Sequence, residues 1–366
     1  MTCKYFGICG SCSLYKDGYE AQLKQKFDEN QKRFENFYKQ DIKVFNSPSS
    51  HYRARAEFRI WHDNDNISYA MTSKDKQAVM IDECPQVNQH IYNLMPKLLQ
   101  KIIKYEIKHK LFGIDFLSSS NGDMVVSMLY HKRLDEIWEE KASEISKDLG
   151  ISIIGRSKKQ KIVIQKDYVI ETLHVKDKAF KYKHIENSFT QPNPKVNEQM
   201  ISWAMEDLKS DSDLLELYCG AGNFTIPFAT KFQKILATEI SKSSINAAKE
   251  NMKLNSITNI EFVRMSVEEF VEALDGVRIF NRTKHIDLDS YDIKSVFVDP
   301  PRAGMDEYSC NFVSRYENII YISCNPLTLH RDLEILSRTH KVTDMALFDQ
   351  FPYTHHVEMG VKLTRI

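Results

Sequence analysis

The chain has 366 residues, enough for two sizeable domains, and its 50 Lys and Arg residues balance 50 Asp and Glu residues. No run approaches the roughly 18 consecutive apolar residues of a membrane span, and no basic segment followed by an apolar one marks a secretory signal. These features exclude an integral membrane protein, and we expect a cytoplasmic protein that binds no membrane.

The balanced total hides an uneven distribution of charge. Residues 1–200 carry 32 Lys and Arg against 26 Asp and Glu, whereas residues 201–366 carry 18 against 24. A net charge of zero argues against a protein that binds nucleic acid by charge alone. A basic half joined to an acidic half nevertheless indicates a polyanionic partner for the first half.

Seven cysteines, an odd number, are distributed along the chain at positions 3, 9, 12, 84, 219, 310 and 324. In a cytoplasmic protein this favours metal binding or catalysis over a disulfide framework. Cys3, Cys9 and Cys12 lie close together at the N-terminus, and three thiol ligands require a fourth. Cys84, in Glu83-Cys-Pro85, is the candidate outside the C-terminal half, and a zinc site is the first interpretation.

From residue 16 to 40 the chain is charged and helical in pattern, and from 51 to about 185 it predicts an antiparallel-rich α+β domain. After the loop at residues 188–193, strands alternate regularly with helices, which is typical of a parallel, doubly wound sheet. The expected helices are 87–108, 134–149 and 242–255. The expected strands are 52–61, 67–71, 78–81, 112–118, 124–130, 151–155, 162–164, 168–173, 214–218, 235–238, 260–264, 295–298, 319–323 and two final antiparallel edge strands, 341–348 and 356–363.

A glycine loop follows the strand at 214–218, in Cys219-Gly-Ala-Gly-Asn-Phe224. Gly220 and Gly222 allow a close backbone approach to a ligand, but Thr225 stands where a dinucleotide site has its third glycine. Glu239 ends the next strand, where an acid typically accepts hydrogen bonds from a ribose. This pattern favours a nucleoside cofactor without phosphates, such as S-adenosylmethionine, and disfavours a reduced folate as methyl donor.

Two further strand ends carry reactive groups: Asp299 in Val298-Asp-Pro-Pro-Arg302, and Cys324 in Tyr321-Ile-Ser-Cys-Asn-Pro326. A lone cysteine on a buried strand is usually an inert small hydrophobe. After a cofactor loop and Asp-Pro-Pro, however, a thiol indicates a carbon target, because its addition at C6 of a pyrimidine makes C5 nucleophilic. A base must then remove the C5 proton. Glu358 suits this role; His355 or His356 could also serve, and all three could equally be surface residues of an edge strand.

Six runs together resemble the RNA uracil-C5 methyltransferase family: residues 51–61, 186–193, 214–224, 297–304, 321–326 and 347–358. The resemblance covers residues 20–366 and is strongest to the branch that modifies the T-loop uridine at tRNA position 54. It implies an RNA partner, the T-arm of tRNA, and no DNA; the substrate uridine is flipped out of its loop. By this similarity Cys324 is the nucleophile and Glu358 the base. The similarity also implies that RNA is contacted by Arg302, Arg53 and Arg55. The residues that it implies for S-adenosylmethionine binding are Gln191, Tyr218, Gly220, Asn223, Glu239 and Asp299.

The spacing of Cys3, Cys9, Cys12 and the distant Cys84 is instead similar to the iron–sulfur ligands of the 23S rRNA uracil methyltransferases. This resemblance implies a [4Fe-4S] cluster, with zinc as the alternative, that ties the N-terminal segment to the central domain. It also makes 23S rRNA the second candidate substrate. Those enzymes often begin with a small β-barrel domain, for which a motif starting at residue 3 leaves no room.

The sequence therefore predicts an α/β protein of three parts: a cysteine-rich cluster-binding segment (1–20), a central α+β RNA-binding domain (21–185) and a Rossmann-like S-adenosylmethionine-dependent methyltransferase domain (186–366). An RNA-folding chaperone whose catalysis is secondary remains an alternative from another class.

Overall fold

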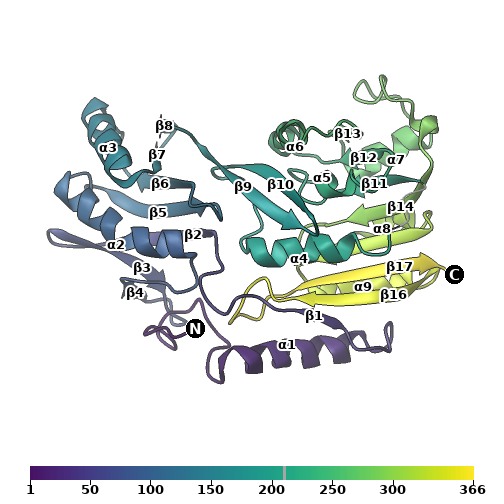
Figure 1. The fold of residues 1–366 in the computed structure, drawn as a ribbon, viewed down its shortest axis with the longest axis horizontal. Coiled ribbons are helices and arrows are strands. Elements are labelled where there is room, and N and C mark those ends of the chain that lie inside the picture. The colour runs from purple at the N-terminus through teal and green to yellow at the C-terminus, as the bar shows by residue number, and fades with distance from the viewer. Residues whose placement is uncertain (209–211) are drawn as a thin grey trace.

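A computed structural model of the chain describes residues 1–208 and 212–366. Two β-sheets stand side by side, and a long two-stranded hairpin, β9 (Tyr168–Val175) and β10 (Lys178–Ile185), runs from one to the other (Figure 1). The α/β class predicted from the sequence is confirmed. Within the described residues, no helix is both long enough and apolar enough to cross a membrane.

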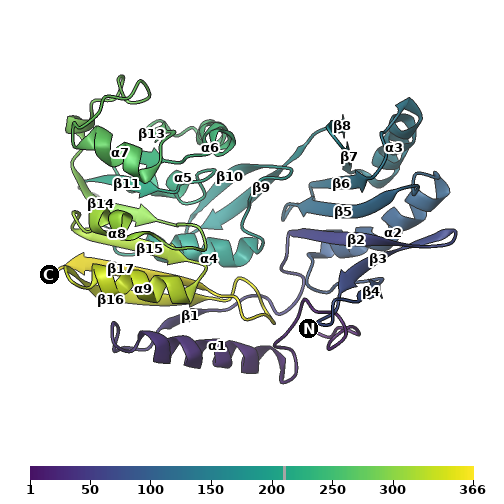
Figure 2. The ribbon, with the colours of Figure 1, turned by 180° about the vertical axis from the view of Figure 1, so that it is seen from behind.

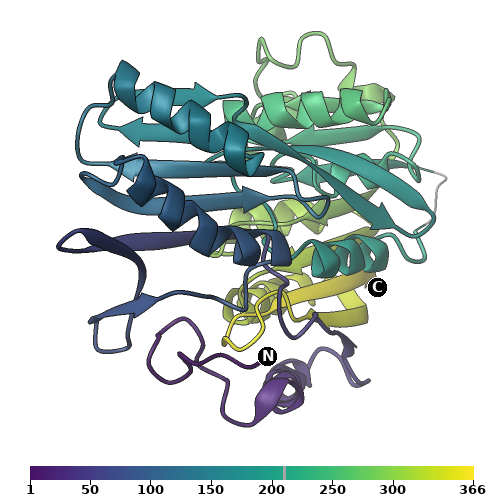
Figure 3. The same cartoon turned by 60° about the vertical axis from the view of Figure 1, so that its left-hand side comes forward.

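The central sheet has the strand order β4-β3-β2-β5-β6-β7-β8 and is antiparallel except for the β6–β7 pair. Helices α2 (Gln89–Lys104) and α3 (Glu136–Leu149) cover one of its faces (Figure 3). Asn88 and Asp135 begin these helices by accepting hydrogen bonds from Ile91 N and Trp138 N. The strands are β2 (Arg55–Asp63), β3 (Asn66–Thr72), β4 (Ala78–Ile81), β5 (Leu111–Ser118), β6 (Met124–Tyr130), β7 (Ser152–Ser157) and β8 (Gln160–Ile164).

The second sheet has the order β1-β16-β17-β15-β14-β11-β12-β13, and its strands from β15 to β13 are parallel. The parallel strands are mostly apolar and buried, as expected where helices cover both faces. The strands of the whole sheet have the following bounds. They are β1 (Lys43–Phe45), β11 (Asp213–Leu217), β12 (Ile235–Thr238), β13 (Ile260–Val263), β14 (Ile293–Val298), β15 (Asn318–Ser323), β16 (His340–Phe348) and β17 (Glu358–Arg365).

Helices pack on both faces of this sheet. On one face lie α7 (Val267–Leu274), α8 (Glu307–Val313) and α9 (Pro326–Leu336), and on the other α4 (Pro194–Ala204), α5 (Thr225–Phe228) and α6 (Lys242–Leu254); a short 3-10 turn spans Leu288–Ser290. Figure 2 shows α8 and α9 in front of the strands.

The N-terminal part of the chain completes the second sheet. Strand β1 pairs in parallel with β16, and Phe34 at the end of α1 (Gly18–Phe34) lies in the same core as β14 and β15. The two final strands pair antiparallel, as predicted, but their expected place at the edge was wrong: β17 lies between β15 and β16, and β1 forms the edge. The predicted central domain, residues 21–185, thus contributes to both sheets.

Candidate active site

The register of three strands brings the predicted thiol and carboxylates together. Strands β14 and β15 are parallel neighbours, so Asp299 and Cys324, which follow them, emerge at the same edge of the sheet. Strand β17 runs antiparallel to β15, with Ser323 opposite Met359. This register places Glu358, the first residue of β17, beside Cys324.

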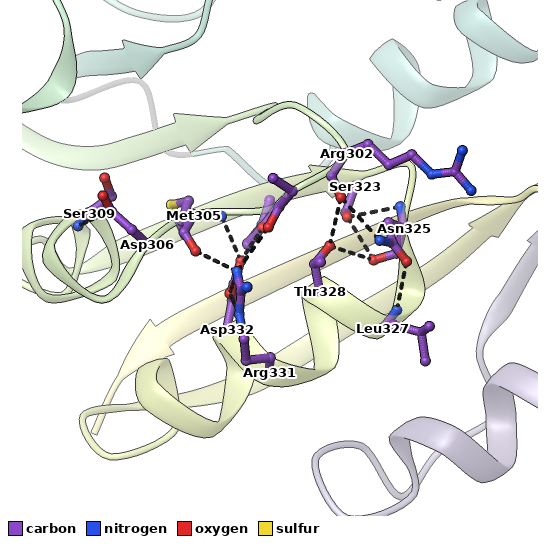
Figure 4. A network of polar contacts seen from close by, with 12 residues as sticks. Arg302, Met305, Asp306, Ser309, Ser323, Asn325, Leu327, Thr328, Arg331 and Asp332 are labelled. Carbon is purple, nitrogen blue, oxygen red and sulfur yellow. Dashed lines mark hydrogen bonds and ion pairs between the residues drawn. The ribbon is translucent and has the colours of Figure 1, made fainter.

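Hydrogen bonds hold the Asp-Pro-Pro-Arg loop against the thiol loop. The Asn325 side-chain amide donates to the Arg302 carbonyl over 3.0 Å, and its oxygen accepts from Leu327 N at the start of α9 over 3.1 Å. The Thr328 hydroxyl also donates to the Arg302 carbonyl. In Figure 4 the guanidinium of Arg302 extends away from this network. The chain that follows Cys324 is therefore fixed against the Asp-Pro-Pro-Arg loop, and Arg302 is one of the residues that line the adjoining cavity.

One cavity of about 460 Å³ contains most of the predicted site. Its lining includes Cys324, Glu358, Asp299, Gln191, Tyr218, Gly220, Asn223 and Arg302. Glu239 is not among the described residues that line this cavity, but it contacts the glycine loop. Its carboxylate accepts hydrogen bonds from Gly220 N (3.2 Å) and Ser241 N (2.7 Å). Arg53 and Arg55 line a second cavity of about 570 Å³, which shares Phe189 and Thr190 with the first.

Burial raises the pKa of the Cys324 thiol and of the two carboxyl groups beside it, Asp299 and Glu358. It raises the pKa of Asp299 to about 7, and burial together with the Asp299 charge raises the pKa of Glu358 well above its usual range. The pKa of the Cys324 thiol rises to about 11, chiefly through burial and then through Glu358 and Asp299, while Arg302 opposes the shift. Such clustered shifts are typical of catalytic sites.

Comparison with known proteins identifies the family. The model of the tRNA (Uracil-5-)-methyltransferase family matches residues 18–366. The tRNA/tmRNA (uracil-C(5))-methyltransferase of Sulfurimonas denitrificans is 66% identical, and that of Aliarcobacter butzleri 51% identical, each over 100% of both chains. The chain belongs to the tRNA (uracil-5-)-methyltransferase family.

The solved structure of Pyrococcus abyssi tRNA (uracil-54, C5)-methyltransferase in complex with S-adenosyl-L-homocysteine has the same fold. It matches with a TM-score of 0.71 over 95% of this chain and 84% of that one, at 20% identity. The predicted family, methyltransferase fold and enzyme class are confirmed: the chain is an S-adenosylmethionine-dependent enzyme of tRNA uracil-C5 methylation.

Glu216 is a cavity residue that the sequence analysis missed. It is 1% exposed near the end of β11, its Oε2 has no hydrogen-bond partner among the described residues, and burial raises its pKa well above the usual range. A buried carboxylate oxygen without a partner on the wall of a cavity suits a cationic ligand, and S-adenosylmethionine is cationic. No local sequence pattern distinguishes such a ligand contact from a buried structural acid.

The charges of the four thiols of the predicted cluster, Cys3, Cys9, Cys12 and Cys84, influence one another, but the structure does not show a metal centre. Gln86 donates to the Cys12 sulfur over 2.8 Å. Burial raises the pKa of Cys12 to about 12 and that of Cys84 to about 11, and the charges of Cys3 and Cys9 add to both shifts. In the described residues, no three His, Cys, Asp or Glu side chains are grouped so that they could hold a metal ion.

The raised pKa of Cys324 predicts how its alkylation depends on pH. Below a pKa of about 11 the thiolate fraction rises tenfold per pH unit, so alkylation by iodoacetamide should rise about tenfold per unit from pH 7 to 9. Replacing Glu358 by Gln removes a negative charge, lowers the Cys324 pKa and should speed alkylation at pH 8. Peptide mass spectrometry measures the Cys324 product by itself. A rate that levels off near pH 8.5, as for an ordinary thiol, would contradict the shift.

Proposed function

We propose that this enzyme methylates C5 of the T-loop uridine at tRNA position 54, with Cys324 as nucleophile and Glu358 as general base. The observation that carries the proposal is the β15–β17 register, which sets this thiol and this carboxylate side by side on one cavity with Asp299. The named substrate of the Pyrococcus abyssi neighbour supports position 54. Because the proposed substrate is tRNA, we assign the enzyme to the cytoplasm.

The reaction begins when the Cys324 thiolate adds to uracil C6. The new S–C6 bond pushes an electron pair onto the C5–C4–O4 system, and C5 becomes nucleophilic enough to take a methyl group. Glu358 then removes the remaining C5 proton; the C5=C6 double bond re-forms and the thiolate leaves. The raised pKa of Glu358 makes it a stronger base than an exposed carboxylate.

The cavity is suited to hold the cofactor beside this thiol. S-adenosylmethionine, when bound, would supply an electrophilic methyl group on a positively charged sulfur; the methyl–sulfur bond would break and its electron pair would remain on that sulfur, as a neutral thioether. We assign its contacts to the predicted set and add one residue, whose free carboxylate oxygen complements the positive charge: Gln191, Tyr218, Gly220, Asn223, Glu239, Asp299 and Glu216. Asn223 is held for this by reciprocal amide hydrogen bonds with Asn197 at 2.8 and 2.9 Å.

The RNA is proposed to run from the active site along the central sheet. Arg53 and Arg55 line the cavity next to the active site, and the Phe189 ring between the two cavities is 80% exposed. A further cavity of about 720 Å³, here called the distal groove, has no Asp or Glu among its described lining residues. It is lined by Phe112, Leu129, Tyr130, His131, Lys132, Arg133, Arg156, Ser157, Lys158, Lys159 and Gln160.

The distal groove combines an aromatic surface with positive charge. The ring of Phe112, 38% exposed, stacks on that of His131 with centroids 4.0 Å apart. Bases stack on such rings, and Lys and Arg side chains bind the phosphates. Phe112 lies five residues along β5 from Leu117, the partner of Arg55, which is roughly 17 Å at the rise of a β-strand. The groove is therefore assigned to RNA beyond the flipped uridine.

Position 54 is tested with unmodified tRNA transcripts. The purified enzyme with S-adenosylmethionine is expected to add one methyl group per wild-type transcript, mapped to U54 by nuclease digestion and mass spectrometry, and none to a U54C transcript. Methylation of a 23S rRNA fragment in place of tRNA would overturn the assignment in favour of rRNA. Normal tRNA folding in a Cys324→Ala strain, with defects only on deletion of the gene, would instead favour a chaperone role.

We also propose that Cys3, Cys9, Cys12 and Cys84 hold a [4Fe-4S] cluster. The segment that carries Cys3, Cys9 and Cys12 supports it, because backbone hydrogen bonds connect this segment to two parts of the fold: Gly10 N donates to Thr72 O in β3, and Ser13 N donates to Tyr353 O. The segment precedes the residues matched by the family model.

Anaerobic purification tests the cluster. A brown protein with about four irons per chain, lost in Cys84→Ser together with thermal stability, is expected. The matched control is Cys310→Ser, a buried thiol elsewhere, which should keep its iron. A colourless protein with one zinc per chain would establish the zinc alternative, and one without metal would overturn both.

A further inference from the structure

Helix α1 buries a polar stripe against the catalytic sheet. Gln22, Lys26 and Asn30 follow one another at four-residue spacing and are only 3%, 2% and 4% exposed. A surface helix normally buries an apolar stripe, because a buried amine without a partner is costly. Lys26 must therefore have a specific partner, and the role of that partner explains why Lys26 is buried.

The partner is Asp349, fully buried just after the end of β16. Lys26 Nζ donates to Asp349 Oδ1 over 2.6 Å and to the Phe351 carbonyl over 3.0 Å. Gln22 Nε2 donates to the other carboxylate oxygen over 2.9 Å, and Tyr353 N donates back to Gln22 Oε1 over 3.2 Å. Two side chains of α1 thus hold three residues of the segment 349–357, which joins β16 to β17. Figure 1 shows α1 running alongside β1 and β16.

This segment reaches the active site at two points. Its chain continues directly into Glu358, the first residue of β17. The residue next to Asp349, Gln350, is also fully buried and donates from Nε2 to Gln191 Oε1 over 2.7 Å. Gln191 lines the same cavity as Cys324. A shift of the segment would therefore move the general base and a cofactor-facing amide together.

We propose that Lys26 and Gln22 are positioning residues for the methyl transfer: through Asp349 they set the place of Glu358 and Gln191. The inference rests on the proposed function. Buried ion pairs add little net stability compared with apolar side chains of similar volume, but they can specify one arrangement. In this enzyme the Lys26–Asp349 pair specifies the arrangement of the segment 349–357, which leads into Glu358.

A role in positioning the base and a role in stability alone predict different kinetics for variants of Lys26 and Gln22. A variant that only folds less well loses active molecules, so every step falls in proportion to the folded fraction. A variant whose base is misplaced still forms the thiol adduct and still transfers the methyl group, but removes the C5 proton slowly. Covalent enzyme–tRNA adduct must then accumulate during turnover.

The test compares Lys26→Met, Lys26→Arg and Gln22→Leu with wild type, and uses Lys24→Met on the exposed side of α1 as the matched control. We expect kcat for Lys26→Met to fall roughly 10- to 100-fold, as for a small misplacement of a catalytic group, with KM for tRNA unchanged and the adduct fraction on denaturing gels raised. Lys26→Arg should recover part of kcat, Gln22→Leu should show the same pattern more weakly, and Lys24→Met should match wild type.

Gln22→Leu leaves the Lys26–Asp349 ion pair in place and serves if Lys26→Met does not fold. Folded variants with wild-type kcat and adduct fraction would overturn the proposal, and so would a kcat that falls only with the folded fraction measured by circular dichroism. Wild type and Glu358→Gln run in the same assay. If neither yields methylated tRNA or adduct, the proposed function itself has failed, which is a different result from normal wild-type turnover with unaffected variants.

Discussion

A Glu358→Gln enzyme is expected to methylate its tRNA once and then stay covalently bound to it. The thiol of Cys324 and the cofactor cavity are unchanged, so addition at C6 and methyl transfer can proceed. The amide cannot take the C5 proton, and the thiolate is not expelled. Loss of a general base typically costs about 10²- to 10⁴-fold in turnover. A denaturation-resistant complex of one chain and one methylated tRNA, seen by gel and mass spectrometry, is the expected product.

Two controls isolate the role of Glu358. Cys324→Ala, alone or combined with Glu358→Gln, should give neither adduct nor methylated tRNA, because no covalent bond to C6 can form. His356→Gln, two residues before the base, should turn over as wild type does; burial and nearby Arg302 lower the pKa of His356, so it is a weak base. Wild-type release of methylated tRNA by Glu358→Gln would remove Glu358 from the mechanism, and an adduct trapped by His356→Gln would put the histidine in its place.

Removing the positive charge of the distal groove should weaken tRNA binding and flatten its salt dependence. The variant carries Lys132→Ala, Arg133→Ala, Lys158→Ala and Lys159→Asn; Asn is chosen at 159 because the backbone there has φ +59°, which Asn tolerates. Each lost phosphate contact should reduce the slope of log K against log salt by about 1, so by about 3 to 4 in total. Fluorescence titration from 50 to 300 mM salt, roughly the range where such contacts dominate, measures the slope.

Alanine at Lys97 and Lys104, exposed on the helix-covered face of the central sheet, is the matched control and should leave the slope unchanged. The single-turnover rate at saturating tRNA should also stay unchanged in the groove variant, because the groove shares no described lining residue with the cavity that contains Cys324. An unaltered slope, or one that changes equally in the control, would exclude the groove from RNA binding.

Most of the sheet that carries the candidate active site could be predicted from local sequence patterns. Parallel strands buried on both faces are apolar throughout, so β11, β14 and β15 stand out, and reactive residues directly after such strands must meet at one edge. For this reason Tyr218, Asp299 and Cys324 were predicted close together, and all three line the one cavity. Glu216 was overlooked because a carboxylate inside an apolar strand has no local pattern that separates a ligand contact from a buried structural acid.

What the sequence by itself determined is the chemistry: a thiol, a cofactor loop and an acid at successive strand ends, sufficient for the family and the reaction. The family resemblance already favoured Glu358 among the three candidate bases, but only the tertiary structure shows it beside Cys324, since the register of β15 with β17 is a long-range pairing that local patterns do not encode. The place of α1 was decided in the same way. Its stripe of Gln22, Lys26 and Asn30 resembles a solvated face, and only the fold shows that Asp349, more than 300 residues away, makes its burial favourable.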